Sequence, residues 1–237
     1  MLHSALDRAL KWGKVQRNVT ELVTPPRVTD TDKTIWTPAQ LRKFLDHANN
    51  YRYGIVFYLA AMTGMRKAEI CGLQWRDIDF HGKKLTVRQT LVYVAGKPTL
   101  QETKTTRSKR TISLDPTTVD KLEKHRRQQL QEKLRLGAAY QDNDFVIARE
   151  DGRPIYYRTM DNQWIKCVEE AGVPRIRFHD LRHTHASLLI AQGVPINVVC
   201  ERLGHAQTSI TMDIYVHSND NQQRQAANAF VSAIFGS

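Results

Sequence analysis

The last third of the chain contains HDLRHTHASLL (residues 179–189), then LGH (203–205), and ten residues after that histidine a tyrosine, Tyr215. In a helix that begins with the first stretch, His179 and Arg182 are three residues apart and project side by side. They lie near a helix N-terminus, where the backbone amides already favour an anion. Arginine holds a phosphate through two parallel hydrogen bonds, and histidine exchanges a proton near neutral pH. The stretch therefore predicts a helical fold that carries a phosphate-binding site.

The composition indicates a basic globular protein with a polyanionic partner. The chain has 237 residues, which is enough for one large domain or two small ones. Lysine and arginine number 35 against 24 aspartate and glutamate, so the formal net charge is 35 − 24 = +11. A surplus of this size favours nucleic acid, because each neutralised phosphate releases counterions. A basic surface without such a partner is the alternative that charge alone leaves open.

The three cysteines, Cys71, Cys167 and Cys200, are widely spaced and form no CxxC pair. This pattern favours a reducing compartment and argues against a disulfide framework or a zinc site. The longest apolar run, residues 54–62, is far shorter than a membrane span, and the N-terminus lacks the apolar stretch of a signal peptide. We therefore expect a soluble, cytoplasmic protein that makes no contact with a membrane.

The beginning of the chain predicts one helix and a linker ahead of a main domain. Apolar residues at helical spacing indicate a helix over residues 2–12, and two prolines within residues 20–33 indicate a linker. One helix cannot form a domain by itself, so we expect residues 1–33 to be the end of a larger unit. The main domain then begins with a helix whose capping box consists of Thr37 and Gln40.

The main domain has the pattern of an α+β fold that is mainly α. Short segments rich in Val, Thr, Leu and Ile over residues 78–114 predict an antiparallel sheet of about three strands. The rest is helical in pattern apart from a short apolar segment at 145–147. We therefore expect a helical bundle with a small three-stranded antiparallel sheet. The expected helices cover about residues 37–49, 52–62, 65–73, 116–136, 158–171, 179–192, 195–203, 207–216 and 221–235.

Further candidate residues are each weak when taken alone. Arg66 in TGMRKAEI has Glu69 three residues on, so the carboxylate can orient the guanidinium, although a surface helix pair is commoner. Lys104 lies in a basic loop, where it could protonate a leaving oxygen or simply contact phosphate. His205 follows a glycine at a helix end and could equally be a cap residue. Tyr215 ends a helix, where a tyrosine is normally part of the core.

The histidines of HDLRHTH allow a second interpretation, a metal site. His179 and His183 are four residues apart, as two ligands on one helix face would be. No third ligand of suitable spacing accompanies them, so this interpretation is the weaker one. His183 and His185 are expected to have structural roles around the site.

Taken together, these residues resemble the tyrosine recombinase (phage integrase) family. TGMRKAEI is similar to the family's first arginine box, KTTRSKR to its hairpin lysine, HDLRHTHAS to its His-x-x-Arg box and LGH to the histidine that follows, with Tyr215 at the place of the nucleophile. The similarity covers about residues 35–220 and is strongest to integrases of temperate phages and Gram-positive integrative elements. The departures are small and fall at Lys67-Ala68 and at Cys71, which replaces a usual aliphatic residue.

The resemblance implies site-specific DNA recombination with no metal, ATP or other cofactor. Tyr215 would attack a DNA phosphate and leave a 3′-phosphotyrosyl bond and a free 5′-hydroxyl, and a 5′-hydroxyl from a partner strand would reverse the step. Bond energy is thereby conserved. The catalytic residues that the resemblance implies are Arg66 and Arg182 on the phosphate oxygens, His179 as base, Lys104 as acid, His205 as a further donor and Tyr215 as nucleophile.

The resemblance also implies a domain order and partners. Residues 1–33 would be the last helix of a core-binding domain plus a linker, residues 34–220 the catalytic domain, and residues 221–237 a C-terminal helix that docks on a neighbouring subunit. The partners would be double-stranded DNA with attachment or core sites and three further copies in a homotetramer on DNA. An excisionase or a host DNA-bending protein is a further candidate, and the place of action would be the nucleoid.

Two rival functions remain open from the sequence. A type IB topoisomerase uses similar chemistry on a single duplex. A truncated, non-catalytic integrase would bind sites and compete for them. A purely structural protein would leave Arg66, Arg182 and Tyr215 without a joint purpose.

Overall fold

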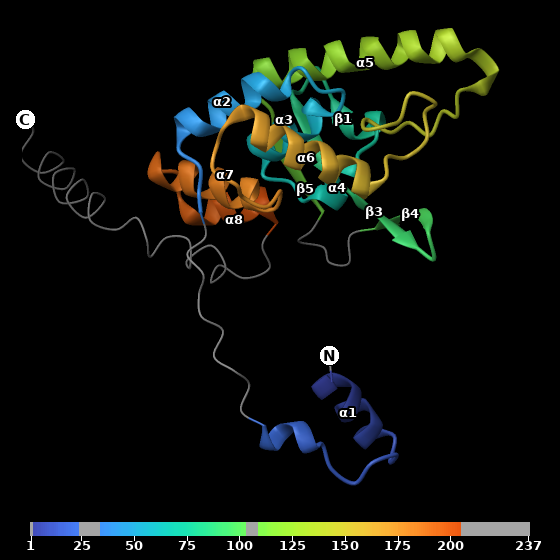
Figure 1. Ribbon diagram of the computed structural model, residues 1–237, viewed down its shortest axis with the longest axis vertical. Helices are drawn as coiled ribbons and strands as arrows, with labels where there is room; N and C mark the ends of the chain where they lie inside the picture. The colour runs from blue at the N-terminus through green and yellow to red at the C-terminus, as the bar shows by residue number, and fades with distance from the viewer. Residues whose placement is uncertain (1, 24–33, 103–108, 205–237) are drawn as a thin grey trace, which may run out of the picture. The chain divides into compact units, whose positions relative to one another are not determined.

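The computed structural model describes residues 2–23, 34–102 and 109–204 (Figure 1). The chain divides into two compact units, residues 1–33 and 34–237. Among the described helices, none is long and apolar enough to cross a membrane.

The first unit consists of helix α1 (Leu2–Lys11) and the 3-10 helix η1 (Val19–Leu22). The predicted N-terminal helix is therefore present, and η1 occupies the start of the stretch predicted to be a linker. Asn18 accounts for this difference, because its side-chain oxygen accepts from the amide of Thr20 and caps η1. Its side-chain amide donates to Asp7 on α1 at 2.7 Å, which joins the two helices.

The second unit is mainly helical, and its helices lie close to their predicted bounds. The expected helices over 207–216 and 221–235 fall outside the described residues. The described α-helices are α2 (Pro38–Ala48), α3 (Gly54–Thr63), α4 (Lys67–Cys71), α5 (Pro116–Leu136), α6 (Tyr157–Ala171), α7 (Asp180–Ala191) and α8 (Ile196–Leu203), and the 3-10 helices are η2 (Trp75–Asp77) and η4 (Gly137–Ala139).

Helix α2 begins as its sequence predicts. The Thr37 hydroxyl accepts from the amide of Gln40, and the Gln40 side chain accepts from the amide of Thr37. Pro38 occupies the first turn, where a missing amide proton costs nothing. Local chemistry alone therefore sets this boundary.

The strands form two small antiparallel sheets instead of one. β1 (Ile78–Asp79), β2 (Lys84–Val87) and β5 (Arg110–Ser113) make a three-stranded sheet in the order β1-β2-β5. β3 (Gln89–Val94) pairs with β4 (Lys97–Glu102) in a separate hairpin. Ala95 and Gly96 turn this hairpin with positive φ at both positions, as a two-residue turn requires.

The predicted three-stranded sheet is thus present, but the described residues of this region form five strands where about three were expected. The hairpin of β3 and β4 is separate from the three-stranded sheet because β3 packs on α4. A Cβ at Gly72, just after α4, would come within 2.7 Å of the backbone nitrogen of Leu91, so only glycine allows this approach. Alternation of residues in the sequence does not show which helix a strand will pack against.

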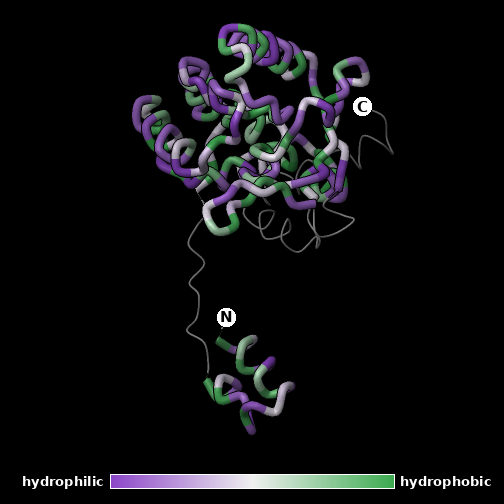
Figure 2. Tube along the Cα trace, turned by 90° about the vertical axis from the view of Figure 1, so that its right-hand side faces the viewer, coloured by the Kyte–Doolittle hydropathy of each residue, from purple (hydrophilic) through white to green (hydrophobic). Residues whose placement is uncertain are grey.

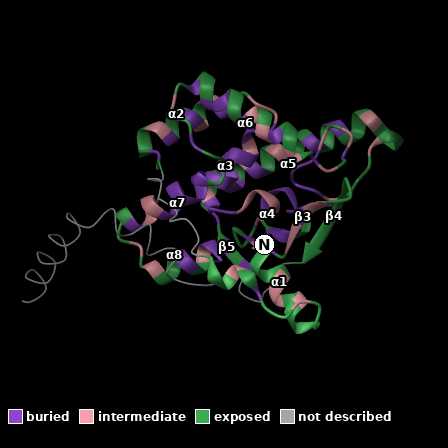
Figure 3. Cartoon of the chain, turned by 60° about the horizontal axis from the view of Figure 1, so that its bottom comes forward, coloured by how far each residue is buried: buried purple, intermediate pink, exposed green. Residues whose placement is uncertain are grey.

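Helix α3 forms the centre of the second unit. Its apolar residues are buried on nearly every side, and Val56, Phe57 and Leu59 are wholly inaccessible. Figure 3 shows α3 as a buried helix with partly exposed helices around it, and Figure 2 shows these outer helices changing between hydrophilic and hydrophobic along their length. The outer helices are therefore amphipathic, and α3 is the element on which they pack.

An aromatic cluster fixes the start of α7. Trp164 on α6 packs against Phe57, Phe44 and Phe178 with ring centroids 4.9 to 5.4 Å apart. Phe178 directly precedes His179 and α7. Burial of this ring therefore sets where the HDLR segment lies in the unit.

Candidate active site

Arg66 lies at the N-terminus of α4, directly after the turn that ends α3. The turn passes through Gly64, whose φ of +64° is left-handed, and a Cβ there would come within 2.4 Å of Leu203. Arg66 is the N-cap of α4, whereas its spacing to Glu69 predicts a place on the helical face. Its backbone amide and its guanidinium each donate to Glu69 at 2.8 Å. The Arg66 side chain is held in this way while 39% of it stays exposed.

Arg182 is buried in the first turn of α7 and bonds to backbone carbonyls. Its guanidinium donates to Gly64 at 2.7 Å and to Leu203 at 2.7 Å. Among the described residues, no carboxylate lies within ion-pair distance of it. Burial, together with the positive charge of Arg66, lowers the pKa of Arg182 to about 9. The group is still protonated at neutral pH, so an approaching anion would be bound by a poorly compensated charge.

Arg110, at the start of β5, is a third guanidinium in the same place. It donates to both carboxylate oxygens of Glu69, at 3.1 and 2.9 Å, and its Nε donates to the carbonyl of Arg202 at 2.7 Å. The basic residues around it in the sequence predict a solvated loop instead. The missed signal is the alternation of Arg110, Ile112 and Leu114, which puts the arginine on the buried face of its strand.

The charges of this cluster do not cancel. Arg66, Arg110 and Arg182 supply three positive charges and Glu69 one negative charge, a surplus of 3 − 1 = 2. Burial alone would raise the pKa of Glu69, but the bonds from Arg110 and Arg66 outweigh it and lower the pKa, so the carboxylate is ionised. A partly buried site with two excess positive charges can bind the charged oxygens of a phosphate group.

His179 stands at the N-terminus of α7 beside this cluster. Desolvation of the ring by the protein atoms around it lowers the pKa of His179, and the positive charge of Arg182 lowers it further. The ring also packs edge-on against His183, with centroids 5.2 Å apart. At neutral pH the imidazole is therefore uncharged and able to accept a proton.

His185 has the structural role expected for it. Its Nδ1 bonds to the carbonyl of Ala61 at 2.8 Å, and its Nε2 accepts from Arg202 at 3.2 Å. Burial, followed by the charge of Arg202, lowers the pKa of His185 to about 4. This histidine is part of the framework behind the cluster.

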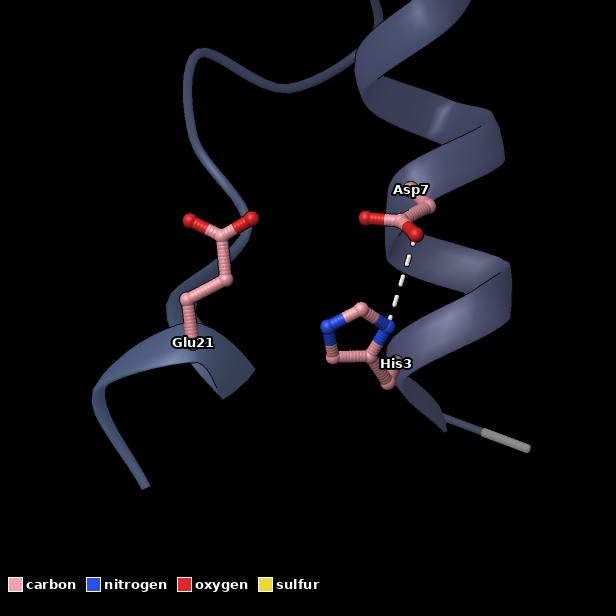
Figure 4. A group of neighbouring side chains, drawn as sticks. All are labelled: His3, Asp7 and Glu21. Atoms are coloured by element: carbon pink, nitrogen blue, oxygen red, sulfur yellow. Dashed lines mark ion pairs between the residues drawn. The ribbon is translucent and has the colours of Figure 1, made fainter. Parts of the chain in front are cut away.

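Among the described residues, no third metal-ligating side chain lies close to both His179 and His183. The one group of three ligand-type side chains found there lies in the first unit, on α1 and η1: His3, Asp7 and Glu21 (Figure 4). His3 and Asp7 are an exposed ion pair of 3.4 Å one helical turn apart. The group is solvent-exposed and belongs to a different unit from the arginine cluster.

Lys104, His205 and Tyr215 lie outside the described residues. The described chain stops at Glu102 in β4 and resumes at Lys109 before β5, and it ends at Gly204. The structure therefore brings Arg66, Arg182 and His179 together with Arg110, which sequence reasoning had not selected. The other three candidates remain predictions from their motifs.

The sequence profile of the phage integrase family matches residues 35–222. The chain belongs to the phage integrase family. The match agrees with the span of about 35–220 over which the motifs resemble the family, so the predicted resemblance is confirmed.

Two similar proteins show how much of a relative's length this chain covers. A protein named tyrosine recombinase XerC-like, from Caldanaerobacter subterraneus subsp. tengcongensis, is 34% identical over 215 residues, covering 86% of this chain and 55% of the relative. The ICEBs1 integrase of Bacillus subtilis is 26% identical over 229 residues, covering 96% of this chain and 62% of the relative. The chain thus spans little more than half the length of these relatives, and the predicted likeness to Gram-positive elements is confirmed.

The fold is also similar to that of a solved integrase structure. The Tn1549 transposon integrase, in complex with a circular intermediate DNA, matches with a TM-score of 0.75 at 18% identity, covering 96% of this chain and 76% of that chain. The likeness confirms the predicted fold class, a mainly helical domain with small antiparallel sheets.

Proposed function

We propose that this chain cuts and rejoins DNA strands in site-specific recombination, through a covalent bond between Tyr215 and a 3′-phosphate. The observation that carries the proposal is the partly buried surplus of positive charge at Arg66, Arg110 and Arg182 beside the uncharged His179. Membership of the phage integrase family and the motif positions of Lys104, His205 and Tyr215 support it.

The arginines act on the phosphate oxygens. Arg66 and Arg182 bind the two non-bridging oxygens and stabilise the charge that builds on them in the transition state. The Tyr215 oxygen forms its bond to phosphorus as the bond to the 5′-oxygen breaks, so the number of phosphoester bonds is unchanged. Arginines in comparable phosphoryl-transfer roles contribute about 10³–10⁵ in rate.

His179 and Lys104 move the protons. A tyrosine has an ordinary pKa of about 10, so it needs a base at neutral pH. His179 takes that proton, and its pKa rises when the negative phosphate offsets the nearby arginines, so substrate binding strengthens the base. Lys104 gives a proton to the leaving 5′-oxygen, and His205 donates a further hydrogen bond to the phosphate. A 5′-hydroxyl of a partner strand then reverses each transfer.

The domain order and partners follow the same proposal. Residues 34–220 form the catalytic domain, residues 1–33 end a core-binding domain and continue into a linker, and residues 221–237 form a helix that docks on another copy. The Tn1549 integrase structure is a complex with DNA, which supports double-stranded DNA as the partner of this chain. We propose a homotetramer on two duplexes, with an excisionase or a DNA-bending protein as accessory factor.

The test of this proposal also identifies the DNA site. A library of nicked duplexes with a randomised 30-base-pair segment (about three helical turns) is incubated with the chain in EDTA, the protein is denatured, and the DNA that stays attached is sequenced. We expect a covalent adduct at a recurring sequence, and none with Tyr215→Phe.

The outcomes separate the proposal from its rivals. Specific DNA binding without any adduct would support a non-catalytic binding protein and overturn the enzyme. Relaxation of a supercoiled plasmid that carries a single selected site would support a topoisomerase. Strand exchange only between two selected sites supports recombination.

A further inference from the structure

Three consecutive carbonyls at the end of α8 each accept a hydrogen bond from a different arginine of the cluster. The donor and acceptor pairs are Arg110 Nε to the carbonyl of Arg202 at 2.7 Å, Arg182 Nη2 to that of Leu203 at 2.7 Å and Arg66 Nη2 to that of Gly204 at 3.4 Å.

These carbonyls lie at a helix C-terminus, which explains why they can serve the arginines. The last carbonyls of a helix have no partner within the helix, and the dipole places partial negative charge there. Gly204 ends α8 in the left-handed conformation, with φ of +68°. The end of α8 therefore partly offsets the guanidinium charges, and its position decides where the three guanidiniums lie.

The side chain of Arg202 forms hydrogen bonds from this helix end to three other elements. Its Nε donates to His185 on α7 at 3.2 Å, its Nη1 to the carbonyl of Ser113 at the end of β5 at 3.2 Å, and its Nη2 to the carbonyl of Met62 on α3 at 3.0 Å. Figure 1 shows α7, α8 and β5 meeting at this side of the second unit. These are the elements that carry or adjoin Arg182, Arg110 and Arg66.

His185 can accept the hydrogen bond from Arg202 only when its ring is neutral. A carbonyl only accepts and a guanidinium only donates, so Nδ1 carries the proton that goes to Ala61 and Nε2 presents its lone pair to Arg202. A charged imidazole could not accept from Arg202. The neutral ring is thus a fixed acceptor behind the cluster.

We infer that Arg202 is a positioning residue for the proposed DNA cleavage: by fixing the end of α8 it sets the geometry of Arg66, Arg110 and Arg182. The inference rests on the proposed function, and it assigns Arg202 no contact with substrate, because its guanidinium already donates to three protein acceptors. One planar guanidinium reaches acceptors on three elements, which the single ammonium of a lysine cannot do in the same geometry.

The first experiment measures positioning without catalysis. Guanidinium NMR signals of Arg66, Arg110 and Arg182 are recorded in the whole chain and in its Arg202→Lys and Arg202→Ala variants. We expect slow rotation of the Nη groups in the wild type and fast rotation in both variants. Unchanged signals in both variants would overturn the inference, even if the wild type forms no DNA adduct and the proposed function fails.

The second experiment separates positioning from stability and from charge. With a nicked duplex selected as above, Arg202→Lys and Arg202→Ala should slow adduct formation by about 10²-fold, the loss that a displacement of about 1 Å can cause. Non-covalent DNA affinity of Arg202→Lys, which keeps the charge, should stay within about twofold of wild type, and that of Arg202→Ala within about twofold of Arg127→Ala, an exposed α5 arginine whose loss removes the same charge.

Each outcome of this second experiment bears on the inference. A Lys variant as fast as wild type would mean that Arg202 contributes charge alone, which overturns it. A rate loss that disappears when wild type and variants are compared at equal distance below their melting temperatures would mean a purely structural role and also overturns it. A rate loss that persists there, in both variants, supports it.

Discussion

Arg52 and Arg182 are both arginines shielded in the second unit, yet the protein compensates their charges in opposite ways. Arg52, next to the start of α3, makes a bidentate ion pair with Glu132 on α5, with hydrogen bonds of 2.5 and 2.9 Å. The hydrogen bonds that Arg52 donates to that carboxylate raise the pKa of Arg52. Arg182 donates instead to two carbonyls, and burial lowers its pKa to about 9.

The difference shows what each arginine contributes. A guanidinium that faces a full carboxylate has its charge neutralised and serves to hold α3 and α5 together. A guanidinium that faces only carbonyl dipoles keeps most of its charge available for an anion. The comparison therefore separates an arginine that stabilises the fold from one that is held ready for a phosphate.

The largest expected effect comes from Arg182. Arg182→Gln should lower the rate of adduct formation by about 10³-fold or more, because a transition-state charge loses its partner. The free energy of unfolding should change less than in Arg52→Ala, since Gln can still donate to one carbonyl and Glu69 keeps its bonds from Arg66 and Arg110, whereas loss of Arg52 leaves Glu132 without its bidentate partner. Denaturant unfolding and single-turnover cleavage measure the two quantities. Equal losses of stability in the two variants would break the comparison.

A second prediction extends the comparison to Arg202, whose partner is a neutral imidazole. The pKa of His185 is about 4 in the fold against 6.5 unfolded, so the unfolded chain binds the extra proton first as the pH falls. Stability from this group is complete above pH 6.5 and is lost between 6.5 and 4, by about 3 kcal/mol. Urea unfolding at several pH values measures it, and His185→Gln should show a shallower decline. Parallel curves for wild type and variant would refute the assignment.

The smallest expected effect concerns Arg52. Arg52→Ala should lower the free energy of unfolding by about 2 kcal/mol, the scale of hydrogen bonds to charged groups, and leave the cleavage rate near wild type. The double variant with Glu132→Ala should lose less than the sum of the single variants, because their contributions couple. A large loss of cleavage rate in Arg52→Ala, measured well below its melting temperature, would place Arg52 in the site and remove the contrast.

Local signals in the sequence predicted the helices well and the sheets less well. The capping box at Thr37 and the prolines and glycines near helix ends act through neighbouring residues, so helix bounds follow from them. The separation of the β3–β4 hairpin from the other strands depends on the close approach of Leu91 to Gly72, which is distant in sequence. Alternating residues do not encode that contact.

Some residues of the candidate site could likewise be predicted from local sequence, and others could not. Arg66, Glu69, His179 and Arg182 could be selected as candidates from the sequence because their motifs are short and specific, and the structure places them close together. Arg110 was missed because a basic loop masked the alternation that marks it as buried, and Arg202 was missed because its three acceptors lie on three separate elements. No local pattern reveals a bond between residues about 90 to 140 positions apart, as for Arg202 with Ser113 and Met62.

The family, the mainly helical fold class, most boundaries of the described helices and the residue types from which a phosphate site can be built could all be predicted from the sequence, since these depend on composition, spacing and local capping. Which arginines keep their charge available for an anion depends instead on the folded arrangement of the chain. Arg52 and Arg182 are the same residue type, and what distinguishes them is the partner that folding brings within reach, a carboxylate for one and carbonyls at two helix ends for the other. That choice of partner follows from long-range packing around α3, α7 and α8.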